Sequence, residues 1–220
     1  DESSNSVIPP NGVPPVVNGF DLNAVEAALL LKDSGADVEI TVLSVGSDFV
    51  MDAMKKPLAM GADRLVLVAD ELLDKLDSSA TVKVLAAAIQ KDGPFDLVLG
   101  GRQASDWDQA HVTLGLSEVL RLPLVSLVKK LEINGDSVSL QRLIPDGYQT
   151  ITAPIPAVLT VTNELGEPRY PNLRGIMQAS RKKPEIFSLD DLGLSPEDLT
   201  PKLELKKLYV PESNKQVELI

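Results

Sequence analysis

Short apolar runs alternate with longer amphipathic segments along the first 128 residues. The apolar runs lack strict polar alternation, as is typical of strands buried on both faces, and lie at residues 38–46, 64–69, 95–101 and 123–128. The segments between them carry apolar residues at helical spacing. These helices are expected at residues 22–32, 48–60, 79–91 and 108–120. Strands that alternate with helices in this way predict an α/β fold, a doubly wound, mostly parallel sheet with helices on both faces.

The pattern changes after residue 128. Residues 129–143 form two apolar-rich stretches around Asn134-Gly135, a dipeptide typical of a tight hairpin turn, so we expect a hairpin insertion here. One further strand is expected at residues 157–162 and one short helix at residues 171–179.

The last stretch of the chain, residues 184–220, contains four prolines and few periodic segments. Its scattered Leu, Ile and Val residues predict an extended C-terminal arm that packs on a partner, with a loosely attached tail as the alternative. We therefore expect one α/β domain at residues 1–183, beginning with a loop over residues 1–17, and a separate arm at residues 184–220.

Composition removes several kinds of function. The 220 residues contain no cysteine and one histidine, His111, which excludes disulfide frameworks, thiolate metal sites, cysteine nucleophiles and multi-histidine sites. We predict no catalytic residue and no metal ligand. With 21 basic and 32 acidic residues the chain carries a net charge of −11, which argues against a nucleic-acid partner. No apolar run approaches 18 residues, so we expect no transmembrane segment and a cytoplasmic or mitochondrial-matrix-like location.

A candidate ligand site follows the third expected strand, at Gly100-Gly101. Ligands of parallel sheets lie beyond the carboxyl ends of the strands, and glycines let the backbone approach them closely. The N-terminus of the next helix suits a phosphate group. The alternative is that Asp106 or Asp108 simply caps that helix. His111 lies one turn into the helix and is more often structural than catalytic at such a position.

A second candidate is the loop after the strand at residues 157–162. Pro168 and Pro171 stiffen this loop, which presents Leu173, Ile176 and Met177, and an apolar tip on a preorganised loop is a plausible docking element. The alternative is that the leucine packs into the protein's own core. The basic cluster at residues 181–183 follows directly and would attract an acidic partner, with a simply solvated cluster as the more usual alternative. The residues alone thus indicate a nucleotide-binding α/β protein with a docking loop.

The sequence also resembles the β subunit of electron transfer flavoproteins, over nearly the whole chain. The stretches that carry the resemblance are Asn18-Gly19-Phe20-Asp21 before an Ala/Val/Glu-rich helix, residues 59–64, Gly101-Arg102-Gln103-Ala104 with Asp106 and Asp108, and residues 156–183 with Glu167-Pro168-Arg169-Tyr170. The last of these is the most specific.

The resemblance implies a function as an electron carrier rather than an enzyme. Members of the family pair with an α subunit that holds most of an FAD site. The heterodimer carries electrons from dehydrogenases, such as acyl-CoA dehydrogenases, to a quinone reductase or another acceptor. The β subunit binds AMP in ordinary members and a second FAD in electron-bifurcating members, whose complexes have NADH-dependent oxidoreductase activity. We favour FAD slightly, because Val112 resembles the Gln-Val-Gly pattern of bifurcating members.

The resemblance also implies roles for individual residues. The nucleotide in the β subunit is expected to contact Asn18, Gly19, Phe20, Asp21, Val45, Gly46, Ala104, Ser105, Asp106, Asp108, His111, Val112, Thr113 and Gly115. Leu173, with Ile176, Met177 and Arg169, is expected to dock to the dehydrogenase. Gln149 would lie near the flavin of the α subunit, and the arm would pack on that subunit.

Four departures from the family pattern stand out. The family's first strand has no counterpart in residues 1–220, and it would supply nucleotide contacts. Thr113 replaces a glycine, which closes off backbone approach to a phosphate. Gln149 replaces a glutamate, which removes a charge beside the flavin, and Gly19 replaces a proline. A stand-alone adenine-nucleotide-binding module with a signalling role is the alternative function. A hydrolase has little support because His111 has no evident nucleophile partner.

Overall fold

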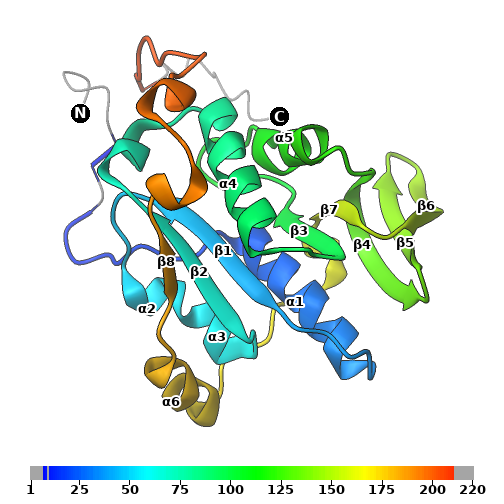
Figure 1. Cartoon of the computed structure of the whole chain (residues 1–220). Coiled ribbons are helices and arrows are strands. Elements are labelled where there is room, and N and C mark those ends of the chain that lie inside the picture. Colours follow the sequence, from blue (N-terminus) through cyan, green and yellow to red (C-terminus); the bar gives the residue numbers. More distant parts are fainter. Residues whose placement is uncertain (1–6, 9, 211–220) are drawn as a thin grey trace, which may run out of the picture.

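The computed structural model describes residues 7, 8 and 10–210 and has the expected α/β architecture (Figure 1). Its helices are α1 (Gly19–Asp33), α2 (Met51–Met54), α3 (Lys56–Met60), α4 (Ser78–Asp92), α5 (His111–Leu120) and α6 (Leu173–Arg181). Its strands are β1 (Thr41–Gly46), β2 (Arg64–Ala69), β3 (Leu97–Gly101), β4 (Leu124–Asn134), β5 (Ser137–Ile144), β6 (Gly147–Pro154), β7 (Ala157–Val161) and β8 (Glu185–Phe187).

The strands of the described chain form two sheets. The first has the order β1-β2-β8 and is entirely parallel. The second has the order β3-β7-β4-β5-β6, in which β3, β7 and β4 are parallel and the β4–β5–β6 meander is antiparallel. The predicted hairpin insertion is confirmed, but it is larger than expected. The strand expected at residues 123–128 continues to Asn134, with an irregularity in its pairing near Val128, and β6 adds a third strand to the hairpin.

A gap separates the two sheets between β1 and β3. Among the described residues β1 pairs only with β2, and β3 pairs only with β7. The residues of β1 are all half-buried, whereas those of β7 are all buried. Two cavities, of about 1840 Å³ and 1060 Å³, are each lined by residues of β1 and β3. The first is also lined by α4 and the second by α1. In Figure 1, α4 crosses in front of this region. One additional parallel strand would join the two sheets into one.

Part of the predicted arm belongs to the α/β domain itself. Strand β8 pairs with β2, and Phe187, Leu189 and Leu199 are buried against β2 and α4. The chain becomes continuously exposed only from residue 200 to residue 207. The extended part of the described arm is therefore shorter than residues 184–220, because apolar side chains up to Leu199 find partners within the same chain.

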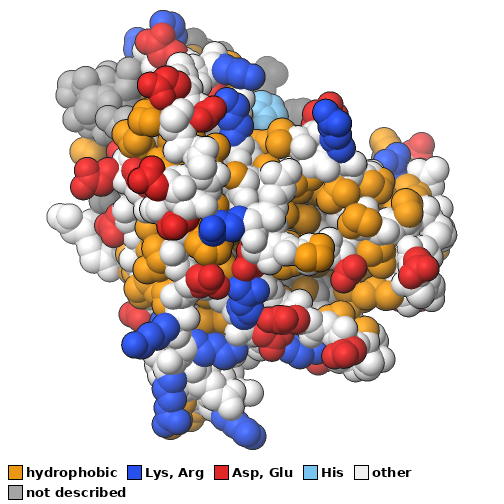
Figure 2. Space-filling model, in the orientation of Figure 1, with side chains coloured by type: hydrophobic (Ala, Val, Ile, Leu, Met, Phe, Trp, Pro, Cys, Tyr) orange, Lys and Arg blue, Asp and Glu red, His pale blue; other side chains and the backbone are white. Residues whose placement is uncertain are grey.

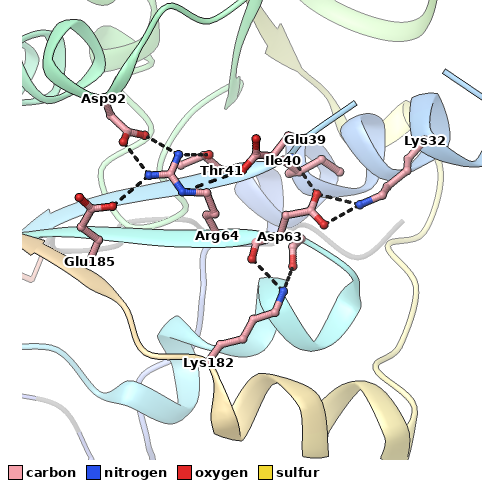
Figure 3. Close-up of polar contacts among 10 residues, drawn as sticks. Lys32, Glu39, Ile40, Thr41, Asp63, Arg64, Asp92, Lys182 and Glu185 are labelled. Atoms are coloured by element: carbon pink, nitrogen blue, oxygen red, sulfur yellow. Dashed lines mark hydrogen bonds and ion pairs between the residues drawn. The ribbon is translucent and has the colours of Figure 1, made fainter. Parts of the chain in front are cut away.

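A network of charged side chains ties these segments together (Figure 3). Lys32 of α1 donates two hydrogen bonds of 2.7 Å to the Asp63 carboxylate, and Lys182 donates to the Ala62 and Asp63 carbonyls. Arg64 donates from Nη2 to Asp92 of α4 at 2.7 Å and to Glu185 of β8 at 3.0 Å. The start of β2 is thus the point where α1, α4, β8 and the segment after α6 are held together.

Candidate functional site

A large cavity opens at the carboxyl edge of β1 and β3. The first turn of α1, the loop between β3 and α5, the start of α4 and residues 201–205 form its walls at this edge. The ligand site expected beyond Gly100-Gly101 therefore coincides with a cavity in the structure.

Hydrogen bonds join the first turn of α1 to the loop after β3. The amide of Asn18 donates to the Gln103 carbonyl at 2.9 Å, and its oxygen accepts a 2.6 Å bond from the Ser105 hydroxyl. Asp21 accepts the backbone N–H of Gly101 at 2.8 Å and the Asn18 amide at 3.0 Å. Asn18 and Asp21 thus position the loop on the cavity, whatever further contact they make with a ligand.

Helix α5 begins at the cavity without a side-chain cap. Its preceding residue, Ala110, has a φ of 55°, and Asp108 has a φ of 51°. Both aspartates proposed as caps have other partners. Asp106 accepts from the Trp107 backbone at 2.9 Å, and Asp108 accepts from the Gln103 amide at 2.6 Å. Among the described residues no side chain caps the first N–H groups of α5, and helix ends of this kind are able to bind anions. Left-handed residues such as Asp108 and Ala110 store strain of the kind found at functional sites.

Thr113 packs directly on the end of β3. A Cβ atom built on Gly100 would lie 2.3 Å from the Thr113 hydroxyl, so glycine is required at residue 100 while threonine stands at residue 113. The side chain that departs from the family pattern thus fills the space beside the strand end.

The variant Gly100→Ala tests this contact. We expect it to lower the free energy of unfolding by about 1–3 kcal/mol, because the added methyl group would overlap with Thr113. In the Thr113→Ala background the same change is expected to cost much less. Urea unfolding of the four proteins measures the coupling, and equal costs in both backgrounds would show that the contact is not what requires glycine.

The structure brings half of the predicted nucleotide-binding residues together. Those that line the cavity are Asn18, Asp21, Val45, Ala104, His111, Val112 and Thr113. Those outside its lining are Gly19, Phe20, Gly46, Ser105, Asp106, Asp108 and Gly115. Gly115 faces α4, where an added Cβ would lie 2.8 Å from the Val82 side chain, so this glycine allows close packing of the two helices.

Several residues of the cavity wall were missed by sequence reasoning. Ser78 and Thr81 lie in the first turn of α4, and the His111 Nδ1 is 3.5 Å from the Ser78 hydroxyl. Asp77, a typical helix-capping residue after β2, marks the start of α4 in the sequence. Because the carboxyl ends of parallel strands lie at one edge of the sheet, this helix start could have been expected beside the loop after β3. Residues 201–205 carried no such signal.

A separate surface lies on α6. Asn172 caps this helix by accepting the Gly175 backbone N–H at 2.8 Å, and Gly175 packs so closely on α3 that an added Cβ would lie 2.3 Å from the Ala59 carbonyl oxygen. The helix is thereby fixed with Leu173 81% exposed, and Ile176 and Met177 are exposed beside it. This finding excludes the alternative in which the leucine packs into the protein's own core.

Exposed basic side chains also lie on and directly after α6. Figure 2 shows Lys and Arg gathered over α6, at the lower end of the molecule, and Arg174, Arg181 and Lys183 are exposed there. The surface therefore combines an apolar centre with positive charge on a chain of net charge −11.

The two remaining predicted residues are placed differently. Gln149 lies exposed on the edge strand β6 and accepts a 3.2 Å hydrogen bond from Arg142. Arg169 points into its own chain. Its guanidinium binds Glu26 of α1 at 2.8 Å and Asp33 at 2.7 Å, so it anchors the loop that leads into α6. Its role in docking stays a prediction.

Comparison with known proteins places these features in one family. The model of the electron transfer flavoprotein domain matches residues 7–192. Subunit CarD of the caffeyl-CoA reductase-Etf complex of Acetobacterium woodii is 39% identical over 186 residues, 84% of this chain and 71% of its own. The electron transfer flavoprotein β subunits of Megasphaera elsdenii and Clostridium acetobutylicum are each 38% identical. These two alignments cover 91% and 95% of this chain, and 77% and 81% of the relatives.

No helix within the described part of the chain has both the length and the apolar character needed to span a bilayer. The matched domain covers most of the chain, and the relatives named above as electron transfer flavoproteins are β subunits. The chain therefore belongs to the β-subunit family of the electron transfer flavoproteins.

Proposed function

We propose that this protein is the β subunit of a heterodimeric electron transfer flavoprotein and carries an adenine nucleotide at the carboxyl edge of its sheet. The observation that carries the proposal is the uncapped N-terminus of α5, which faces a cavity directly after β3. Backbone N–H groups at a helix N-terminus bind phosphate without a basic side chain. His111 and Ser78 add polar groups to the same wall.

The nucleotide is AMP or a second FAD. The name of the Acetobacterium woodii relative, a subunit of a caffeyl-CoA reductase-Etf complex, favours a bifurcating complex with FAD. Thr113 fills space beside Gly100 and favours the smaller ligand. If FAD is present, the complex has NADH-dependent oxidoreductase activity, and if AMP is present, the protein is a carrier without turnover of its own.

We take the rest of the electron path from what the family resemblance implies. An α subunit holds the main FAD, whose chemistry is that of the cofactor. In this proposal Gln149 on β6 lies beside that flavin, and the exposed arm packs on the α subunit. The dehydrogenase docks on α6, and electrons leave to a quinone reductase or another acceptor. Among the residues that the structure describes, the facing edges of β1 and β3 have no strand partner, which supports the expectation that the family's first strand belongs between them. The expected compartment is the cytoplasm or a mitochondrial matrix.

Nucleotide analysis of the purified complex tests this function. We expect the chain to elute with its α subunit on a sizing column at micromolar concentration. Acid release should then yield either one FAD and one AMP per heterodimer, or two FAD. A chain that stays monomeric beside the α subunit and binds ATP alone would instead support the stand-alone adenine-nucleotide module.

A further inference from the structure

The chain crosses the cavity once more after the last short helix, Pro196–Leu199. We call residues 200–205 the strap. Pro201, Lys202, Leu203, Glu204 and Leu205 all line the cavity that also contains His111 and Ser78. Every one of these five residues is exposed, and Leu203 is 61% exposed. Burial of apolar side chains therefore contributes little to holding the strap in place.

Two hydrogen bonds that the strap donates to Asp77 hold it against the cavity wall. One carboxylate oxygen, Oδ1, accepts the Ala80 backbone N–H at 2.8 Å and so caps α4. The other, Oδ2, accepts the N–H groups of Lys202 at 2.7 Å and Leu203 at 2.9 Å. Burial raises the pKa of the Asp77 carboxyl, but these donors outweigh it and lower that pKa below its usual value. One side chain thus joins two walls of the cavity.

The segment just before the strap is fixed separately. Lys83 of α4 donates a 2.8 Å hydrogen bond to the Asp198 carbonyl, and Asp198 forms a capping box with Ser195. Leu199 is buried against α4. The strap therefore starts from an anchored point, and its first described contact beyond that point is with Asp77.

We propose that Asp77 is a positioning residue for the nucleotide site, which holds the strap as one wall of the cavity so that nucleotide binding and strap docking stabilise each other. This inference rests on the proposed function. A nucleotide that touches the docked strap binds that state more tightly, and by thermodynamic reciprocity it then protects the strap from opening. The nucleotide and the part of the arm beyond the strap would thereby be coupled.

The variant Asp77→Asn separates the two roles of the side chain. An asparagine oxygen still caps α4, because asparagine is among the best N-cap residues. Its NH₂ group replaces the oxygen that accepts from the strap. The backbone N–H groups of Lys202 and Leu203 would then face a donor instead of an acceptor. Asp191→Asn is the matched control. Asp191 likewise accepts hydrogen bonds, from Ser188, but does not line the cavity.

Trypsin and nucleotide titration test the proposal on the full chain. Lys202 lies in the strap and is a tryptic site. In the free protein we expect Asp77→Asn to be cut after Lys202 about tenfold faster than the wild type, since two hydrogen bonds to a charged group are lost. The Kd for AMP, or for FAD if that is the ligand found, should rise about tenfold. Bound nucleotide should slow cleavage in the wild type and in Asp191→Asn, but not in Asp77→Asn.

A change on the strap itself completes the test. Leu203→Pro removes one N–H that Asp77 accepts and leaves the α4 cap intact. We expect it to weaken nucleotide binding. The double variant with Asp77→Asn should bind nucleotide no more weakly than Asp77→Asn alone. Faster cleavage of Asp77→Asn with unchanged nucleotide affinity would overturn the coupling. A wild type that binds neither nucleotide would overturn the proposed function and the coupling with it, whatever the cleavage rates.

Discussion

Arg169→Ala is expected to lower the free energy of unfolding by about 3 kcal/mol at neutral pH, because it leaves a buried carboxylate without its partner. Glu26 is 6% exposed, and its carboxylate receives the Arg169 guanidinium at 2.8 Å and the Arg169 backbone N–H at 3.0 Å. Urea unfolding measures the loss. Arg142→Ala is the control, since Arg142 binds Gln149 at an exposed sheet edge and should cost less than about 0.5 kcal/mol.

The pH dependence of the Arg169→Ala variant has a definite sign. Burial raises the pKa of the Glu26 carboxyl, but in the wild type the bonds from Arg169 outweigh it and lower that pKa. A lowered pKa stabilises the fold above the unfolded value of about 4.3, and the gain is lost as the pH falls. Without Arg169, burial alone raises the pKa. The deficit of the variant should therefore shrink in acid, and Glu26→Gln should relieve it at neutral pH. A deficit independent of pH would contradict this account.

The ion pair of Arg169 also shows what sequence reasoning could not reach. Arg169 stands in a polar, proline-rich loop, and the family resemblance predicts a docking role for it. Its partner Glu26 lies 143 residues away on the buried side of α1, and no local pattern links the two. Asn23, one turn earlier, similarly donates to the Gly166 carbonyl. In the sequence, the polar residues Asn23 and Glu26 on an otherwise apolar helix face were the one sign that buried partners were needed.

Local patterns were reliable where local physics decides the structure. The strand at residues 64–69 was predicted with its observed bounds, because a continuous apolar run is bounded by polar residues. The helix expected from residue 108 begins at His111, because Asp108 and Ala110 adopt left-handed conformations, which alanine rarely takes. The separation into two sheets depends on which strands pair across long distances in the sequence. The spacing of apolar residues along the chain contains no information about this pairing. The strap is likewise held by side chain to backbone bonds across 125 residues.

Leu173→Ala is expected to leave folding and flavin content unchanged and to slow electron transfer from the dehydrogenase about tenfold or more. Leu173 is 81% exposed on a helix that its cap and Gly175 hold in place, so its side chain contributes little to the stability of the free protein. If the side chain is buried in the complex, its transfer from water contributes about 1.5–3 kcal/mol to docking. The second-order rate constant with the dehydrogenase, measured by stopped-flow, reports the loss.

Two comparisons separate a docking role from a general surface effect. Leu72→Ala removes an exposed leucine outside α6 and should leave the rate constant unchanged. Raising the ionic strength should slow the reaction of wild type and Leu173→Ala by similar factors, because Arg174, Arg181 and Lys183 remain in both proteins. A Leu173→Ala protein that transfers electrons at the wild-type rate would remove α6 as the docking surface. Leu173 would then need another partner, because the cap and the close contact of Gly175 keep its side chain exposed. The α subunit would be the first partner to test.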